Sequence, residues 1–273
     1  MHYGENDTRF PLPQGLHPAK WRFDIGPQNF MHGFANPARF LRLARWLTPL
    51  SLGLGVIIAT AALAWGVFLA PADELQGETV RILYLHVPTA WLGMGGWMAI
   101  AAASLTELVW RHPLAGIAAR ATALPGAAFA AICLVTGSLW GRPAWGTWWV
   151  WDGRLTSMLV LLFLYMGYMA LANAAEQDGQ GDSRIPAIFG LVGAVNIPII
   201  HYSVLWWNSL HQPPSITMGK SAMAPDFLVP LLAGTLGFSL LFGGVVLARM
   251  RAILANAQAE ARLRRKAMAE DLG

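Results

Sequence analysis

The sequence is poor in charged residues and has long stretches that lack them altogether. Only 12% of its 273 residues are Asp, Glu, Lys or Arg, whereas soluble domains carry about 25%. Hydrophobic residues make up 55% of the chain, so too few polar side chains remain to cover a core of that size in water. This composition excludes an ordinary soluble domain and indicates a membrane protein that crosses the bilayer several times.

Cysteine is almost absent as well. The single one, Cys133, stands within an apolar stretch. It excludes a disulfide within the chain, a thiol redox pair and the CxxCH motif of covalent haem attachment. The net charge of +4 does not indicate nucleic acid, because the basic residues flank hydrophobic segments and form no single stripe.

Six segments are long and apolar enough to cross a hydrocarbon core, which takes about 20 helical residues. Backbone groups in lipid must pair internally, so each is predicted to be helical and the fold to be all-α with six transmembrane helices. Pro198 lacks a backbone N–H and is expected to kink the fifth. The predicted segments are 47–69, 84–109, 121–140, 156–175, 185–206 and 227–248.

The basic residues orient these helices. Six spans put both termini on one side, and that side carries all but four of the 19 Lys and Arg residues, which makes it cytoplasmic by the positive-inside rule. The four on the other side are Arg81, Arg142, Arg154 and Lys220.

Three regions are predicted along the chain. Residues 1–44 form a polar N-terminal extension whose several prolines and lack of an apolar run argue against a secretory signal. Residues 45–250 form the six-helix membrane domain, and residues 251–273 form a basic cytoplasmic tail.

Tryptophans are concentrated in the outer segment 140–157, WGRPAWGTWWVWDGRLTS. The spacing predicts a short helix, bounded by Gly141, Pro143 and Gly153, with one face formed by Trp145, Trp148, Trp149 and Asp152. An aromatic belt is one interpretation, but belts usually supply one or two tryptophans per helix end. The density, which includes Trp151, favours a stacking surface for a planar apolar ligand. Asp152 either orders this loop through hydrogen bonds or contacts the ligand.

Three of the seven histidines fall at the outer end of the predicted bundle. Two imidazoles from separate segments beside an aromatic surface are what six-coordinate haem iron requires. His86 and His211 are the predicted pair. His201 lies deeper and is better explained as an interhelical hydrogen bonder, which leaves it as a reserve ligand.

A haem bound here would be non-covalent haem b, and its two propionates would need cationic partners. Arg81, close before His86, and Arg154, just after Asp152, are the predicted partners because carboxylates favour guanidinium groups. The alternative is that both arginines extend to lipid headgroups.

These residues lie in strings that resemble the CcmC family, the haem-handling C subunits of the bacterial system I cytochrome c maturation pathway. The Trp-rich run is similar to that family's WWD domain. The matching strings are LYLHVPTAW (83–91), VTGSLWGRPAWGTWWVWDGRLTS (135–157) and NIPIIHYSVLWWNSLHQ (196–212).

The resemblance implies a protein of the bacterial inner membrane that has six spans, both ends in the cytoplasm and its site on the periplasmic side. The family's external histidines, thought to be axial haem ligands, match His86 and His211. The implied role is to present haem for loading onto a periplasmic chaperone (CcmE). The implied partners are a small membrane subunit (CcmD) and the ATP-binding-cassette subunits CcmA and CcmB.

The sequence shows neither a Walker motif nor a nucleophile with an acid–base pair, so it is not expected to be an enzyme. Two other functions stay open. A transporter that moves haem through its own bundle requires polar groups along a midplane path, and Glu107, Asn196 and His201 are among the few present. If the chain is a structural docking subunit, replacing His86 and His211 should cause no loss of bound haem.

Overall fold

A computed structural model describes residues 36–177, 184–207, 209–211, 215–217 and 220–270. The regular elements of the described residues are helices, apart from one antiparallel pair of two-residue strands, β1 (Ile216–Thr217) and β2 (Lys220–Ser221). Six helical segments are long and apolar enough to cross a membrane, which confirms the predicted all-α fold with six spans. Their bounds are Pro37–Leu69, Glu78–Trp110, Ala115–Trp145, Gly153–Glu176, Arg184–Trp206 and Pro225–Glu270.

Several of these spans combine more than one element. The first joins an α-helix to a π-helical turn, the second begins with a 3₁₀ turn, and the fifth consists of two short helices. The elements are α1 (Pro37–Ala64), η2 (Trp65–Leu69), η3 (Glu78–Ile82), α2 (Leu83–Trp110), α3 (Ala115–Trp145), α4 (Gly153–Gln177), α5 (Arg184–Gly193), α6 (Asn196–Trp206) and α7 (Pro225–Glu270).

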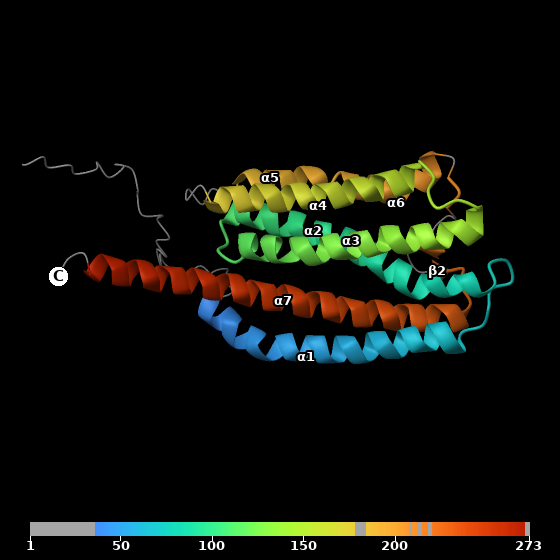
Figure 1. Cartoon of the computed structure of the whole chain (residues 1–273), viewed down its shortest axis with the longest axis horizontal. Helices are drawn as coiled ribbons and strands as arrows, with labels where there is room; N and C mark the ends of the chain where they lie inside the picture. The colour runs from blue at the N-terminus through green and yellow to red at the C-terminus, as the bar shows by residue number, and fades with distance from the viewer. Residues whose placement is uncertain (1–35, 178–183, 208, 212–214, 218–219, 271–273) are drawn as a thin grey trace, which may run out of the picture.

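The first and last helices are longer than their apolar segments. Asn36 caps α1 by accepting the N–H of Ala38 at 2.9 Å, and Pro37 occupies the first turn, where its missing N–H costs nothing. Helix α7 has 46 residues, which at about 1.5 Å each is roughly twice the thickness of a hydrocarbon core. Its described end and the start of α1 lie at the same end of the molecule (Figure 1).

The predicted kink in the fifth span is confirmed as a break between α5 and α6. Pro198 has no N–H to bond the carbonyl of Ala194, and that carbonyl instead accepts the N–H of Ile197 at 3.1 Å. Because of the break, α5 packs mainly on α2 whereas α6 packs on α4.

The helices form two packed groups, with α1 and α7 side by side along one flank of the others (Figure 1). Small residues allow α1 and α7 to approach closely, since a Cβ on Gly237 would lie 2.4 Å from the backbone nitrogen of Ala59. In the other group Trp97 is fully buried with Tyr165, their ring centroids 5.0 Å apart. This core holds the helices whose ends form the site.

Candidate functional site

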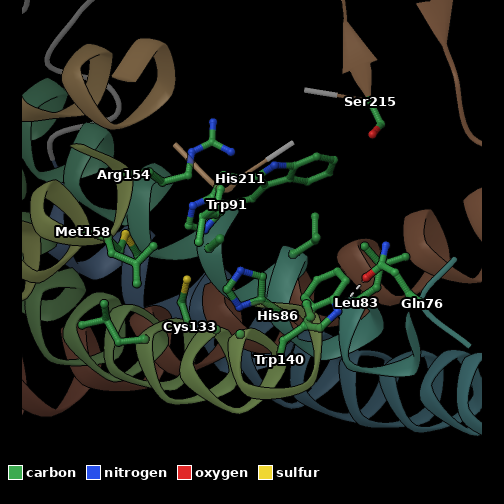
Figure 2. A pocket seen from close by; sticks show the side chains of 18 of the residues that line it. Gln76, Leu83, His86, Trp91, Cys133, Trp140, Arg154, Met158, His211 and Ser215 are labelled. Carbon is green, nitrogen blue, oxygen red and sulfur yellow. Dashed lines mark hydrogen bonds between the residues drawn. The ribbon is translucent and has the colours of Figure 1, made fainter. Parts of the chain in front are cut away.

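A cavity of about 580 Å³ opens at the end of the bundle opposite the described end of α7. Its volume lies within the range of sites that take cofactor-sized ligands, about 300–1,000 Å³. His86 and His211, far apart in the sequence, both line it, so the structure brings the two predicted ligands to one cavity (Figure 2). Most of the other lining side chains are apolar, among them Val87, Leu134 and Ile200.

His86 stands in the first turn of α2, and its ring rests against α3. Its Nδ1 atom lies 3.0 Å from Oγ1 of Thr136, which also hydrogen-bonds the carbonyl of Ile132 at 2.7 Å. A Cβ on Gly137 would be only 2.9 Å from Cε1 of the ring, so the missing side chain makes room for the imidazole. Trp140 meets the same ring edge-on, with centroids 5.7 Å apart.

His211 follows α6 and is held by Asp152. Its Nδ1 atom lies 2.9 Å from Oδ2 of that carboxylate, whose side chain is 2% exposed. Ser209 donates its hydroxyl to the same Oδ2, and the N–H of Leu155 donates to Oδ1 at 2.8 Å. Asp152 therefore caps the start of α4 and ties it to the chain after α6.

The electrostatics of this pair favour a neutral imidazole beside an ionised carboxylate. Burial raises the pKa of Asp152, but the hydrogen bonds from Ser209, Leu155 and His211 outweigh it and leave that pKa below its usual value. Burial lowers the pKa of His211 despite the opposing effect of Asp152. A neutral ring that donates Nδ1–H to the carboxylate leaves the Nε2 lone pair for a metal.

The prediction of a short tryptophan-bearing helix was wrong. Helix α3 runs through Gly141 and Pro143 as far as Trp145, and Gly146 ends it with a left-handed φ of 79°. The segment that follows is not helical until α4 begins at Gly153. A helical stripe over residues 145–152 therefore does not form.

The tryptophans are divided between the cavity and the surface. Trp145 lines the cavity and contacts the ring of His211, with centroids 4.7 Å apart. Trp148 and Trp151 are 55% and 75% exposed, and the half-buried Trp149 packs edge-on against Trp151. The structure does not bring these three to the cavity wall.

Two other tryptophans, Trp91 and Trp140, complete the aromatic part of the wall. Neither was predicted from the sequence to be a site residue. Trp140 is held in place because its Nε1 donates to Oε1 of Gln76 at 2.8 Å. The signal for Trp91 was its position in the histidine-bearing string, just over one helical turn after His86.

The two arginines predicted to pair with the propionates lie in different places. Arg154 lines the cavity and donates to the carbonyl of His201 at 3.3 Å. Arg81 forms an ion pair with Glu78 and is not part of the wall. The structure thus brings one predicted propionate partner to the two histidines.

His201 also reaches the cavity, although it is exposed. Its ring packs against Tyr202 of the same helix, with centroids 4.8 Å apart. The interhelical hydrogen bond expected of this ring is not present among the described residues. Asn196 fills that role instead by donating to the carbonyl of Ser157 on α4 at 2.9 Å.

The donor set fits an iron porphyrin better than a bare metal ion. Among the described residues no group of three or more His, Cys, Asp or Glu could hold an ion, and structural zinc sites usually need four protein ligands. Haem iron brings four ring nitrogens and needs only axial ligands. Two imidazoles, an apolar and aromatic wall and one arginine match that requirement.

The chain is similar to known proteins over most of its length. The family model CcmC, described as heme exporter protein C, matches residues 30–265. The chain is 50% identical over 218 residues to heme exporter protein C of Bradyrhizobium diazoefficiens, covering 80% of this chain and 82% of the relative. It is 46% identical over 224 residues to the protein of the same name from Escherichia coli K12, covering 82% and 90%. The corresponding Rhodobacter capsulatus protein is 37% identical over 238 residues, covering 86% and 98%.

Proposed function

Since this chain belongs to the heme exporter protein C (CcmC) family, we propose that it binds haem through His86 and His211 and presents it for cytochrome c maturation. The observation that carries the proposal is that both imidazoles line one cavity. Each has an Nδ1 hydrogen-bond partner, Thr136 for one and Asp152 for the other. Bound haem would be non-covalent, held by iron ligation at both histidines.

The wall of the cavity supplies the remaining binding energy. Trp91, Trp140 and Trp145 offer rigid aromatic surface next to the two histidines, and burying apolar area contributes about 25 cal/mol per Å². Arg154 would pair with a propionate, because a guanidinium group binds a carboxylate through two parallel hydrogen bonds. These contacts orient haem without covalent attachment, so it remains transferable.

The remaining parts of the proposal concern place and partners. By the positive-inside rule both termini would lie in the cytoplasm and the cavity on the periplasmic side of the bacterial inner membrane, since most Lys and Arg residues flank the side of the termini. From there haem would be loaded onto the chaperone CcmE, with CcmD beside this chain and CcmA and CcmB using ATP. The chain acts as a binding and presenting subunit in this scheme.

A passage for haem through the bundle is less well supported. Asn196, one of the few polar residues of the spans, bridges α6 to α4 through the carbonyl of Ser157. His201 and Arg154 lie at the cavity, toward the same end as His86 and His211. Glu107 lies in the last turn of α2, at the opposite end of that helix from His86. Since Asn196 is engaged between helices and His201 belongs to the cavity, these residues favour presentation over passage.

The absorption spectrum of the purified full-length protein tests the proposal. Wild type expressed with sufficient haem should show Soret and α/β bands of low-spin, six-coordinate haem. His86→Ala and His211→Ala should each lose most of this signal at equal expression. His112→Gln, at the opposite end of the bundle, is the matched control. Colourless wild type, or full haem content in both alanine variants, would favour a docking subunit instead.

A further inference from the structure

The hydrogen bond between His86 and Thr136 determines which ring nitrogen carries the proton. A hydroxyl has one hydrogen to donate. The hydroxyl of Thr136 donates to the carbonyl of Ile132, 2.7 Å away, and the carbonyl of Cys133 is a second acceptor at 3.1 Å. Toward Nδ1 of His86, 3.0 Å away, the oxygen can therefore only accept. With the hydroxyl hydrogen on that carbonyl, this contact favours a proton on Nδ1, which leaves Nε2 its lone pair.

We infer that Thr136 is a positioning residue that holds His86 in its iron-binding tautomer, and that His86 is the more easily exchanged of the two axial ligands. The inference rests on the proposed function and deepens it. Thr136 lies on α3, outside the tryptophan-rich loop, and would act on a bound iron only through its hydrogen bond with His86.

The inequality of the two ligands follows from their partners. His211 donates Nδ1–H to a carboxylate, and His86 donates it to a neutral hydroxyl. Hydrogen bonds with one charged partner are about twice as strong as neutral ones, and a carboxylate partner raises the basicity of the coordinating nitrogen. His211 is accordingly the anchoring ligand, and His86 is the ligand that a competing axial ligand would displace first.

The surroundings of His86 keep its ring in one orientation. Three residues within about one turn of α3 surround the imidazole. The ring contacts Thr136 and Trp140 and occupies the space that a side chain at Gly137 would fill. If the hydroxyl were removed, the ring would keep its place but its Nδ1–H would lose the hydroxyl oxygen that accepts it. The other tautomer, which presents N–H in place of a lone pair at Nε2, would then compete.

Variants of Thr136 in the full-length protein test whether its hydroxyl holds His86 in the iron-binding tautomer. Thr122, on the same helix, is the matched control. Thr122 also bonds the carbonyl four residues before it, at 2.7 Å, and is 4% exposed against 7% for Thr136. Absorption and electron paramagnetic resonance spectra of the ferric protein would report the spin state. Thr136→Val should shift most of the haem from low-spin to high-spin, whereas Thr136→Ser and Thr122→Val should remain low-spin. Cyanide should bind Thr136→Val at least about tenfold more tightly than wild type, because loss of an outer partner costs about 10–100-fold in metal affinity.

Equal spectra for Thr136→Val and Thr136→Ser, whether both low-spin or both high-spin, would overturn the inference, as would unchanged cyanide affinity. If Thr136→Val is not recovered as monodisperse protein, Thr136→Ala removes the same hydroxyl with less bulk. Wild type without a low-spin spectrum would instead remove the proposed function itself, so the two failures are distinguishable.

Discussion

Nδ1 of His211 and Oδ2 of Asp152 lie 2.9 Å apart, although 59 positions separate the two residues. This contact joins the chain after α6 to the first turn of α4, because the other carboxylate oxygen accepts the N–H of Leu155. One aspartate thus serves as a helix cap and as the partner of a predicted iron ligand. Substitutions can separate these two roles.

Asp152→Asn is expected to impair haem binding more than folding. Asparagine caps helices about as well as aspartate, so Oδ1 can still accept from Leu155. The atom facing His211 becomes an NH₂ donor, however, which favours a proton on Nε2 in place of the lone pair. Haem affinity should fall about 10–100-fold, measured by titrating haem into the apoprotein and following the Soret band.

The matched control for this substitution is Asp73→Asn. Asp73 also accepts backbone N–H groups, from Leu75 at 3.0 Å and Gln76 at 2.8 Å. The Asp73→Asn substitution should leave haem affinity near the wild-type value. Unchanged affinity in Asp152→Asn would show that the carboxylate does not set the state of His211.

Gly137→Ala is expected to displace the ring of His86. The new Cβ would lie 2.9 Å from Cε1 of the imidazole, closer than real Cβ contacts allow. Overpacking costs about 1–3 kcal/mol, so haem retention should fall about tenfold. The control is Gly95→Ala on α2, where a Cβ meets nothing within 4 Å. Haem content per protein after dialysis is the measurement, and equal retention in the two variants would contradict the prediction.

The fold was largely predictable because hydropathy reports burial in lipid directly. It predicted six spans, and Pro198 predicted the break of the fifth. It did not predict where α1 and α7 extend beyond the apolar segments, because helix outside the membrane has no hydropathic signature. Asn36 and Pro37, a capping residue followed by a first-turn proline, were the local signal for the start of α1.

The site was less predictable because its geometry depends on side chains that meet across helices. Periodicity predicted the tryptophans on one helical stripe, but the left-handed Gly146 ends α3 directly after Trp145, the first residue of that stripe. Residue type and position in the sequence were enough to predict that His86 and His211 would meet, and both line one cavity. It could not indicate that Thr136, one of several threonines in the spans, would be the one to meet a histidine.

Arg154→Gln should weaken haem binding, and Arg81→Gln should not. Arg154 lines the cavity, whereas Arg81 pairs with Glu78 away from it. Loss of a charge-assisted hydrogen bond costs about 1.5–3 kcal/mol, so affinity should fall roughly 10–100-fold. Haem titration of both apoproteins checks this, together with a haem analogue whose propionates are esterified. The analogue should bind wild type and Arg154→Gln equally, and a preserved difference between them would contradict propionate pairing.

The division of the tryptophans predicts opposite results for two alanine substitutions. Trp145 lines the cavity and packs against His211, so Trp145→Ala removes aromatic wall next to the anchoring ligand. Haem affinity should fall at least about tenfold, because the lost ring contributes area burial and aromatic contact together. Trp145→Phe should recover part of it.

Trp151→Ala is the counterpart, since that side chain is 75% exposed and is not part of the cavity wall. Its Soret band and haem affinity should match wild type. The thermal unfolding midpoint of each apoprotein separates lost haem contact from lost folding. If Trp151→Ala releases haem as readily as Trp145→Ala while both unfold at the wild-type temperature, the ligand rests on the outer surface of the loop. The cavity beside His86 and His211 would then not be the site that holds it.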